Sequence, residues 1–146
     1  MKRSLYVIAA LAFVATAALA HNGVKTPAVM ARMEAMSAIA KNMKTLGEFA
    51  KGAAPFSATQ AQTAASAIAQ HASQTETLFR NQETDPKSEA LPAIWQNFAD
   101  FTAKANELQN LATTYSTALQ TLDDLKPAMG ALGATCKSCH SDYRKK

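Results

Sequence analysis

The chain has 146 residues, with 15 lysines and arginines against 11 acidic residues, five glycines, five prolines and two cysteines. This length suits one domain. So few glycines and prolines exclude a disordered linker protein, and two cysteines cannot form the several disulfides of a small secreted scaffold. A packed apolar core must therefore stabilise the fold.

The first 20 residues have the features of an export signal. Basic residues at positions 2–3 precede an apolar run over residues 5–20, which ends in the small-x-small sequence Ala-Leu-Ala. The run is shorter than the roughly 20 residues that a bilayer span needs, so cleavage after Ala20 is expected rather than a membrane anchor. We expect a signal peptide (1–20) and one mature domain (21–146), located in the periplasm, with no membrane span after cleavage.

The formal net charge is +4, and loss of the two basic residues of the signal peptide would lower it by two. The remaining basic residues are scattered and no aromatic-basic motif accompanies them, so no binding to nucleic acid is expected. Export also places the two cysteines in an oxidising compartment.

Apolar periodicity predicts two helices in the first half of the mature chain. The first is expected over residues 27–51, with Thr26 as its cap and Pro27 at its first position, where the missing N–H would be unpaired anyway. Its stripe repeats at spacings of four and three residues, through Val29, Met33, Met36, Ala40, Met43, Gly47 and Ala50. The second is expected to begin at Ser57, a capping residue, with the stripe Ala61, Ala65, Ile68, Ala72, Thr75 and Phe79. A polar loop over residues 83–88 returns the chain.

Two further helices are predicted in the second half. The third has one continuous stripe, with Trp95 beside it, through Leu91, Ile94, Phe98, Phe101, Ala105, Leu108, Ala112, Tyr115 and Leu119. The fourth has the stripe Leu125, Met129, Leu132, Cys136, Cys139 and Tyr143. Proline is tolerated in the first turn of a helix, so Pro127 places the cap at Asp123 or a near neighbour. The predicted fold is all-α, an antiparallel up-down four-helix bundle whose alanine-rich core could take up a large apolar group.

The fourth helix carries the sequence Cys136-Lys137-Ser138-Cys139-His140, the C-x-x-C-H attachment sequence of c-type haem. Each cysteine sulfur forms a thioether with a haem vinyl group, and the adjacent imidazole becomes an axial ligand of the iron. Residues at positions i, i+3 and i+4 share one face of a helix, so both sulfurs and the imidazole can reach one porphyrin. We therefore expect one covalently attached haem c, with His140 as the proximal iron ligand.

Three other uses of the cysteines fit less well. A C-x-x-C redox pair usually occurs in a thioredoxin-like βαβ context, and the sequence predicts no strands. Zinc would want four protein ligands, whereas the other histidines are His21, expected at a frayed terminus, and His71, expected on the surface. A disulfide between residues three apart closes almost no loop and adds little stability.

The other axial ligand is left open by periodicity. Met33, Met36 and Met43 all fall on the stripe of the first helix, and a thioether pairs with histidine in electron-transfer cytochromes. Methionines are also common core fillers, so spacing does not choose among the three.

At this point the chain resembles the cytochrome c-prime superfamily, the class II c-type cytochromes. The likeness covers nearly all of the mature chain: the C-terminal C-x-x-C-H on the last helix of an exported bundle, Lys-Gly-Ala-Ala-Pro-Phe at 51–56, Pro-Ala-Ile-Trp at 92–95, and Asp-Tyr-Arg at 142–144. In that family the first helix faces the open side of the haem. The resemblance supports the expected fold and adds roles for individual residues.

The resemblance implies that Met36 is the distal iron ligand, because a methionine at the matching position marks the low-spin cytochrome c-556 type. It places Arg32 near a haem propionate, with a solvated charge beside Glu34 as the other interpretation. Arg144 matches a position near the proximal ligand. Phe79 and Phe101 match aromatic positions that pack on the haem, although both would also suit a core without haem.

The expected function is that of a periplasmic electron carrier with His/Met-ligated iron, not an enzyme, monomeric or homodimeric. Its partners would be redox proteins of the periplasmic electron-transport chain, steered by Lys137, Arg144, Lys145 and Lys146 toward an acidic surface. One alternative is a five-coordinate cytochrome c-prime that binds nitric oxide or carbon monoxide. Another is a haem-free helical adaptor or a copper-binding bundle that uses its methionines.

Overall fold

The computed structural model describes residues 23–146, so the predicted signal peptide and His21 lie outside the described residues. Within this part the chain forms the helices α1 (Pro27–Ala50), α2 (Ala58–Ser73), α3 (Thr75–Phe79), α4 (Ala93–Gln96), α5 (Phe98–Ala118) and α6 (Leu122–Tyr143). The same stretch contains no strand, only an isolated bridge between Ala90 and Arg144. None of the described helices is both long and apolar enough to cross a membrane.

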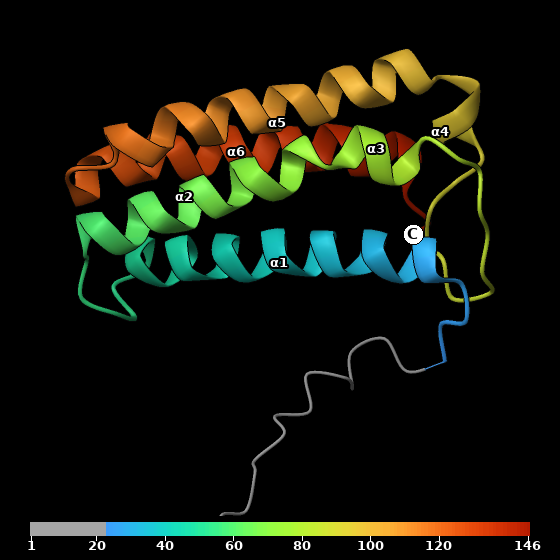
Figure 1. The fold of residues 1–146 in the computed structure, drawn as a ribbon. Helices are drawn as coiled ribbons and strands as arrows, with labels where there is room; N and C mark the ends of the chain where they lie inside the picture. Colours follow the sequence, from blue (N-terminus) through green and yellow to red (C-terminus); the bar gives the residue numbers. More distant parts are fainter. Residues whose placement is uncertain (1–22) are drawn as a thin grey trace, which may run out of the picture.

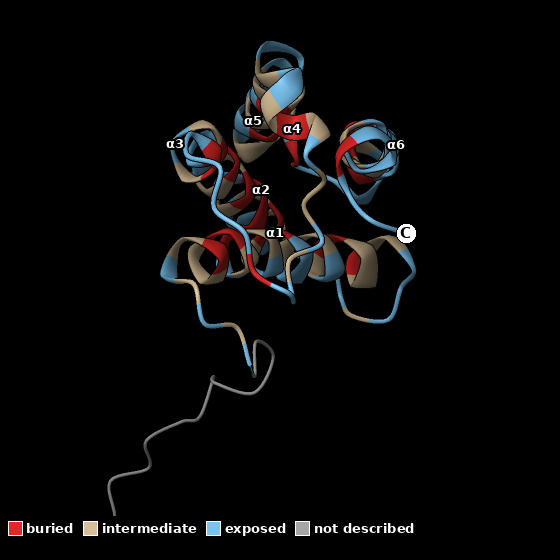
Figure 2. Ribbon diagram, turned by 90° about the vertical axis from the view of Figure 1, so that its right-hand side faces the viewer, coloured by how far each residue is buried: buried red, intermediate tan, exposed pale blue. Residues whose placement is uncertain are grey.

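The four long helices form the predicted antiparallel up-down bundle. Successive long helices run in opposite directions, and α3 and α4 lie at the same end of the bundle as the start of α1 and the C-terminus (Figure 1). α1 packs against α2 and α6, and α5 packs against the same two helices, so the four surround a common core. In the view along the bundle, the buried residues of each helix face this core (Figure 2).

The first helix has the predicted start, but its buried face is rotated. Its buried residues are Val29, Arg32, Ala35, Ile39, Leu46 and Phe49. Of the predicted stripe, Val29 is buried and Ala40 is exposed, so the prediction was wrong at Ala40. The other members are half-buried and lie beside the buried face: Met33, Met36, Met43, Gly47 and Ala50. Two stripes with the same four-three spacing run side by side on this helix. The one with Ile39 and Leu46 faces the core because these side chains bury more apolar area than Ala40 and Gly47.

The second predicted stripe is confirmed, although two helices carry it. The hydroxyl of Ser57 accepts the N–H of Gln60 at 3.4 Å, as expected of an N-cap. α2 ends at Ser73 and α3 begins at Thr75. All six stripe residues from Ala61 to Phe79 are buried.

The third predicted helix is broken at Asn97, whose φ of −129° and ψ of 47° are not helical. Ile94 and Trp95 therefore lie on the short helix α4, and the stripe resumes with Phe98 at the start of α5. The apolar spacing continues in register across the break, so periodicity alone does not reveal it.

The N-cap of the last helix is Thr121, two residues before the expected cap at Asp123. The hydroxyl of Thr121 accepts the N–H of Asp124 at 3.3 Å, and the Asp124 carboxylate accepts the N–H of Thr121 at 2.8 Å. This reciprocal capping box satisfies two donors that would otherwise lack partners and so fixes the start of the helix. Pro127 consequently lies inside the helix, beyond the first turn.

Asp85 attaches the α3–α4 connection to the start of α1. Its buried carboxylate accepts the N–H groups of Lys25 at 2.8 Å, Thr26 at 3.1 Å and Lys87 at 2.9 Å. These backbone donors lower the pKa of the Asp85 carboxyl below its ordinary value, with Lys87 the largest contributor. Side-chain bonds of this kind hold the connection against the bundle.

The buried apolar residues form two groups. We call the larger the main core cluster: Ile39, Leu46, Phe49, Ala61, Ala64, Ala65, Ile68, Ala112, Leu119, Leu125, Ala128 and Leu132. We call the smaller the aromatic cluster: Phe79, Ile94, Phe101 and Tyr143. The aromatic cluster brings together residues of α3, α4, α5 and α6, so it lies at the end of the bundle where the last helix ends.

Candidate haem-binding site

The C-x-x-C-H motif occupies the last turns of α6, as predicted. Cys136 and Cys139 are both free thiols and half-buried, and His140 follows one residue later. Because these three residues are spaced i, i+3 and i+4 within one continuous helix, their side chains share a face. Two sulfurs and one imidazole on a single helix face are the donor set that a covalent c-type haem requires.

The surroundings shift the pKa values of all three groups. Burial raises the pKa of the Cys136 thiol and raises that of Cys139 to about 11. Burial, and then the positive charge of Arg144, lower the pKa of His140 below its ordinary value of 6.5. The imidazole is therefore neutral at neutral pH, as an iron ligand must be.

An apolar wall stands beside the motif. The Phe101 ring centroid lies 5.0 Å from that of Phe79 and 5.3 Å from that of Tyr143. Partly buried apolar side chains also pack against the aromatic cluster, and Cys139 is among them. The structure therefore brings the predicted packing residues Phe79 and Phe101 to the cluster that Cys139 of the motif contacts.

One methionine of α1 reaches the same place. Met36 is partly buried and packs against both the aromatic cluster and the main core cluster. Met43 packs against the main core cluster, farther along α1, and Met33 is half-buried and belongs to neither cluster. Of the α1 methionines, Met36 is the one that shares the aromatic cluster with Cys139. The packing thus distinguishes three residues that sequence spacing left equivalent.

Arg32 is placed in a way that the sequence analysis did not foresee. Only 3% of the residue is exposed, so the interpretation as a solvated charge was wrong. Its Nε donates to the carbonyl of Leu78 at 2.8 Å, Nη1 to that of Glu83 at 2.8 Å and Nη2 to that of Asn81 at 2.6 Å. We call this set of three hydrogen bonds the carbonyl clamp. The sequence did contain a hint of this burial, because position 32 belongs to the second apolar register of α1, the one with Ile39 and Leu46.

Arg144 lies four residues beyond His140. Its backbone N–H donates to the carbonyl of His140 at 3.2 Å, and its exposed guanidinium pairs with Glu89 at 2.6 Å. Beside it, the N–H of Lys145 donates to the carbonyl of Glu89 at 2.8 Å, and the N–H of Leu91 donates to the carbonyl of Tyr143 at 3.0 Å. The end of α6 is therefore attached to the segment that precedes α4.

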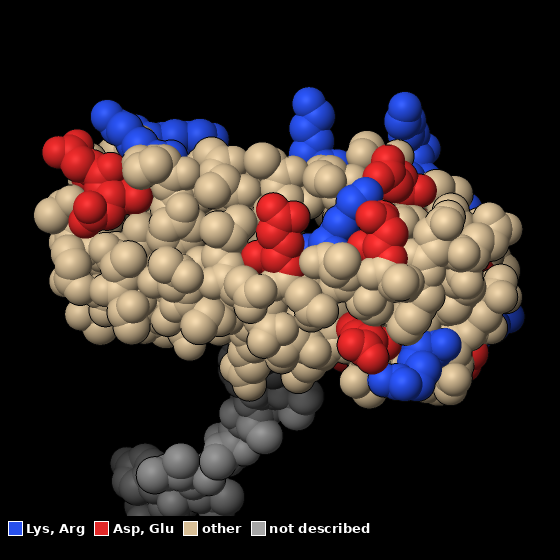
Figure 3. All heavy atoms as spheres, turned by 90° about the horizontal axis from the view of Figure 1, so that it is seen from above, with Lys and Arg blue, Asp and Glu red and all other residues tan. Residues whose placement is uncertain are grey.

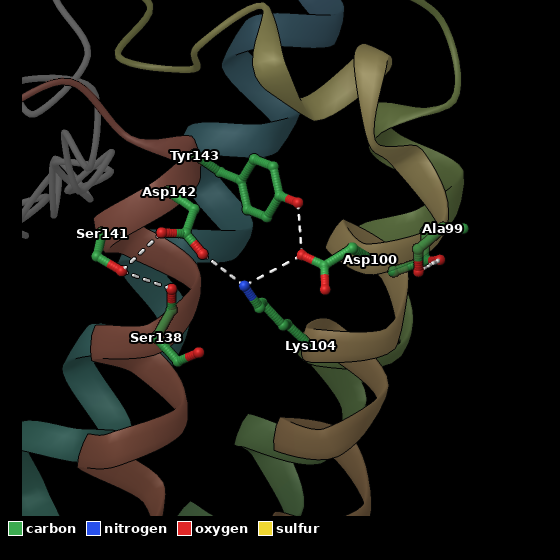
Figure 4. Close-up of polar contacts among 8 residues, drawn as sticks. Ala99, Asp100, Lys104, Ser138, Ser141, Asp142 and Tyr143 are labelled. Atoms are coloured by element: carbon green, nitrogen blue, oxygen red, sulfur yellow. Dashed lines mark hydrogen bonds and ion pairs between the residues drawn. The ribbon is translucent and has the colours of Figure 1, made fainter.

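A polar network missed by the sequence analysis joins α5 and α6 next to the motif (Figure 4). Lys104 pairs with Asp142 at 2.5 Å and with Asp100 at 3.1 Å, and the Tyr143 hydroxyl donates to Asp100 at 2.6 Å. The charges of Lys104 and both aspartates influence the pKa of the Cys139 thiol, so the network lies close to it. The i, i+4 spacing of Asp100 and Lys104 is visible in the sequence, but their partners on α6 are not.

The network makes a testable contribution to alkaline stability. The hydrogen bond to Asp100 raises the pKa of Tyr143 from 10.0 to about 12. Because the folded-state pKa is raised, the stabilisation is complete below pH 10 and is lost as the pH rises through about 12. We expect Tyr143→Phe to be less stable than the wild type at neutral pH, with the difference shrinking across this range.

Thermal unfolding followed by circular dichroism at pH 7 to 12 measures this difference. Tyr115→Phe, which alters a tyrosine packed on the main core cluster, is the matched control. A wild-type advantage over Tyr143→Phe that stays constant up to pH 12 would contradict the assigned hydrogen bond.

Comparison with known proteins gives a consistent result. The family model described as Cytochrome C′ matches residues 27–144. Cytochrome c-554 of Cereibacter sphaeroides is 37% identical over 121 residues, covering 76% of this chain and 87% of the relative. Cytochrome c-556 of Agrobacterium fabrum is 36% identical over 115 residues, covering 76% of each chain.

The fold is shared with solved structures. Cytochrome c′ from Rhodopseudomonas palustris superposes with a TM-score of 0.78 at 28% identity, covering 84% of this chain and 98% of that chain. The family match extends over nearly every residue that the structure describes, including the C-x-x-C-H helix. The chain therefore belongs to the cytochrome c′ family of four-helix-bundle haem proteins, and its cofactor is haem c.

Proposed function

We propose that this protein is a periplasmic electron carrier whose haem is attached to Cys136 and Cys139 and whose iron is held by His140 and Met36. The observation that carries the proposal is the position of Met36, which packs against the same aromatic cluster as Cys139. A relative at 36% identity is named cytochrome c-556, the type that the sequence resembles. The export signal expected over residues 1–20 supports the compartment.

The residues at the site have complementary tasks in this proposal. When bound, the haem supplies one-electron chemistry between ferrous and ferric iron. His140 offers a neutral imidazole, and Met36 offers a soft, neutral thioether from the neighbouring helix α1. Phe79 and Phe101 provide apolar surroundings that exclude water. A thioether ligand in such surroundings favours ferrous iron, so we expect a higher reduction potential than a bis-histidine site would have.

The partner is proposed to be a redox protein with an acidic surface. Lysine and arginine side chains protrude along the edge of the molecule that α6 forms (Figure 3). Lys137, Lys145 and Lys146 are exposed, whereas Arg144 is paired with Glu89 and adds less to the net charge of this edge. The rate of electron exchange with an acidic partner should fall as ionic strength rises, because salt screens the attraction. A rate independent of salt would contradict charge steering.

The spectrum of the natively matured protein tests the ligand assignment. We expect low-spin optical and magnetic spectra at neutral pH in both oxidation states, because two axial ligands leave no open site on the iron. A high-spin ferric spectrum would contradict Met36 as the ligand and would favour a five-coordinate, gas-binding protein. That second candidate draws on the structural similarity to a cytochrome c′.

A further inference from the structure

Arg32 is a buried cation in the wall of the proposed haem site. Its guanidinium lies 4.9 Å from the centroid of the Phe79 ring and 5.5 Å from that of the Trp95 ring. The indole Nε1 of Trp95 donates to the carbonyl of Phe79 at 2.8 Å, so both rings are fixed to the same stretch of backbone. The carbonyl clamp and the two rings together surround the guanidinium.

Burying the Arg32 guanidinium lowers the stability of the fold unless its hydrogen bonds compensate. Moving a charged group out of water carries a large free-energy penalty, which neutral carbonyls and ring faces offset only in good geometry. An apolar residue of similar volume would avoid the penalty and still fill the space. A buried guanidinium differs from an apolar residue because its N–H groups make directed hydrogen bonds. When these bonds all go to one segment, they fix the position of the helix relative to that segment.

The element that the clamp fixes is the turn of α1 that carries Met36. Positions 32 and 36 are i and i+4, so the two side chains lie one above the other on the same helix face. The carbonyls that Arg32 contacts lie between Leu78 and Glu83. Phe79 lies within this stretch and belongs to the aromatic cluster that Met36 contacts. Loss of the Arg32 hydrogen bonds would therefore allow α1 to move relative to the aromatic cluster.

We propose that Arg32 is a positioning residue for the distal ligand: by clamping the carbonyls of Leu78, Asn81 and Glu83, it holds Met36 where its thioether can bind the iron. The inference rests on the proposed function, since it takes Met36 to be the ligand. It assigns Arg32 a role separate from the propionate contact expected from sequence resemblance.

The substitution Arg32→Lys distinguishes the clamp role from a propionate contact. A propionate contact depends mainly on positive charge, which Arg32→Lys retains. The clamp depends on the planar fork of the guanidinium, whose several N–H groups point in fixed directions, and a single ammonium cannot reproduce that fork. Arg32→Lys should therefore behave like the wild type if charge matters and unlike it if the clamp matters.

The experiment uses natively matured haem proteins: wild type, Arg32→Lys, Met36→Ala as the reference for a lost ligand, and Arg80→Lys as the matched control. Arg80 is an exposed arginine close by in sequence, paired with Glu76 at 2.8 Å. We measure the ferric spin state by optical and magnetic spectra and the affinity of the ferrous protein for carbon monoxide, which competes with the thioether for the iron.

We expect Arg32→Lys to show a high-spin fraction and about ten-fold tighter carbon monoxide binding, as follows from a ten-fold rise in the population of iron without its thioether. Arg80→Lys should match the wild type. Trp95→Phe is the second variant, because it removes the indole hydrogen bond to Phe79 but leaves Arg32 in place. It should change both measurements in the same direction by a smaller factor.

The outcomes separate the two proposals. A low-spin wild type, a high-spin Met36→Ala and an unchanged Arg32→Lys would overturn the clamp role alone. Should Arg32→Lys fail to fold, Trp95→Phe with wild-type spin state and wild-type carbon monoxide affinity would also overturn it. A wild type that is already high-spin would overturn the Met36 assignment, and the positioning role with it.

Discussion

Replacing Met36 with alanine is expected to convert the ferric protein from low-spin to high-spin and to give the ferrous protein ready access to carbon monoxide. The alanine side chain has no atom that can bind iron, so one axial site becomes available to exogenous ligands. The reduction potential should fall, because a thioether ligand favours the ferrous state. Optical and magnetic spectra, carbon monoxide titration and redox titration measure the three effects.

Two other methionines of the same helix provide the controls. Met33→Ala and Met43→Ala remove the same side chain from α1, but neither residue packs against the aromatic cluster. Both variants should keep the low-spin spectrum, with any loss limited to stability. A high-spin Met43→Ala together with a low-spin Met36→Ala would identify Met43, seven residues farther along α1, as the ligand instead. No spectral change in any of the three would remove methionine from the iron altogether.

Replacing both attachment cysteines, Cys136→Ser and Cys139→Ser together, should abolish covalent haem binding. A serine hydroxyl does not add across the vinyl groups, so haem staining on a denaturing gel is expected to disappear. The double variant should also unfold at a lower temperature than the wild type, since a ligand bound to the folded state stabilises it. Its alanine-rich core would lack the large apolar group that fills the site.

Lys137→Ser is the control for this variant, because it alters the same motif without touching a sulfur or the imidazole. It should retain the haem stain and the low-spin spectrum. Each single cysteine variant leaves one thioether, so a weaker stain is expected. A double variant that still carries haem through a denaturing gel would contradict the assigned attachment.

The existence of the helices and the attachment motif could be predicted from the sequence because both depend on residues close together in the chain. Four-three apolar spacing identifies an amphipathic helix without reference to its neighbours. Ser57 marks a helix start because its hydroxyl accepts a backbone N–H of the first turn, and Pro27 marks one because its missing N–H would have no partner there. The spacing of Cys136, Cys139 and His140 indicates one shared helix face for the same local reason.

The choice between equivalent local patterns required the packed structure. Two registers of α1 have the same spacing, and contact with α2, α3 and α6 buries the one that contains Arg32, Ile39 and Leu46. Met33, Met36 and Met43 were likewise equivalent in spacing; the family resemblance pointed to Met36, and the structure packs Met36, but neither of the other two, against the aromatic cluster. Such choices depend on which residues of distant segments lie opposite, which no local pattern reports.

By itself, then, the sequence determined a bundle of helices with a covalent haem at its C-terminal end, since helix propensity and motif spacing are local properties. The tertiary structure decided the carbonyl clamp of Arg32, the break at Asn97 and the network around Lys104. The clamp joins Arg32 to Glu83, which is 51 positions away, and the network joins Lys104 to Asp142, which is 38 positions away. They exist because burying the shared apolar surface brings those segments together, and the polar groups then find partners across the resulting contacts.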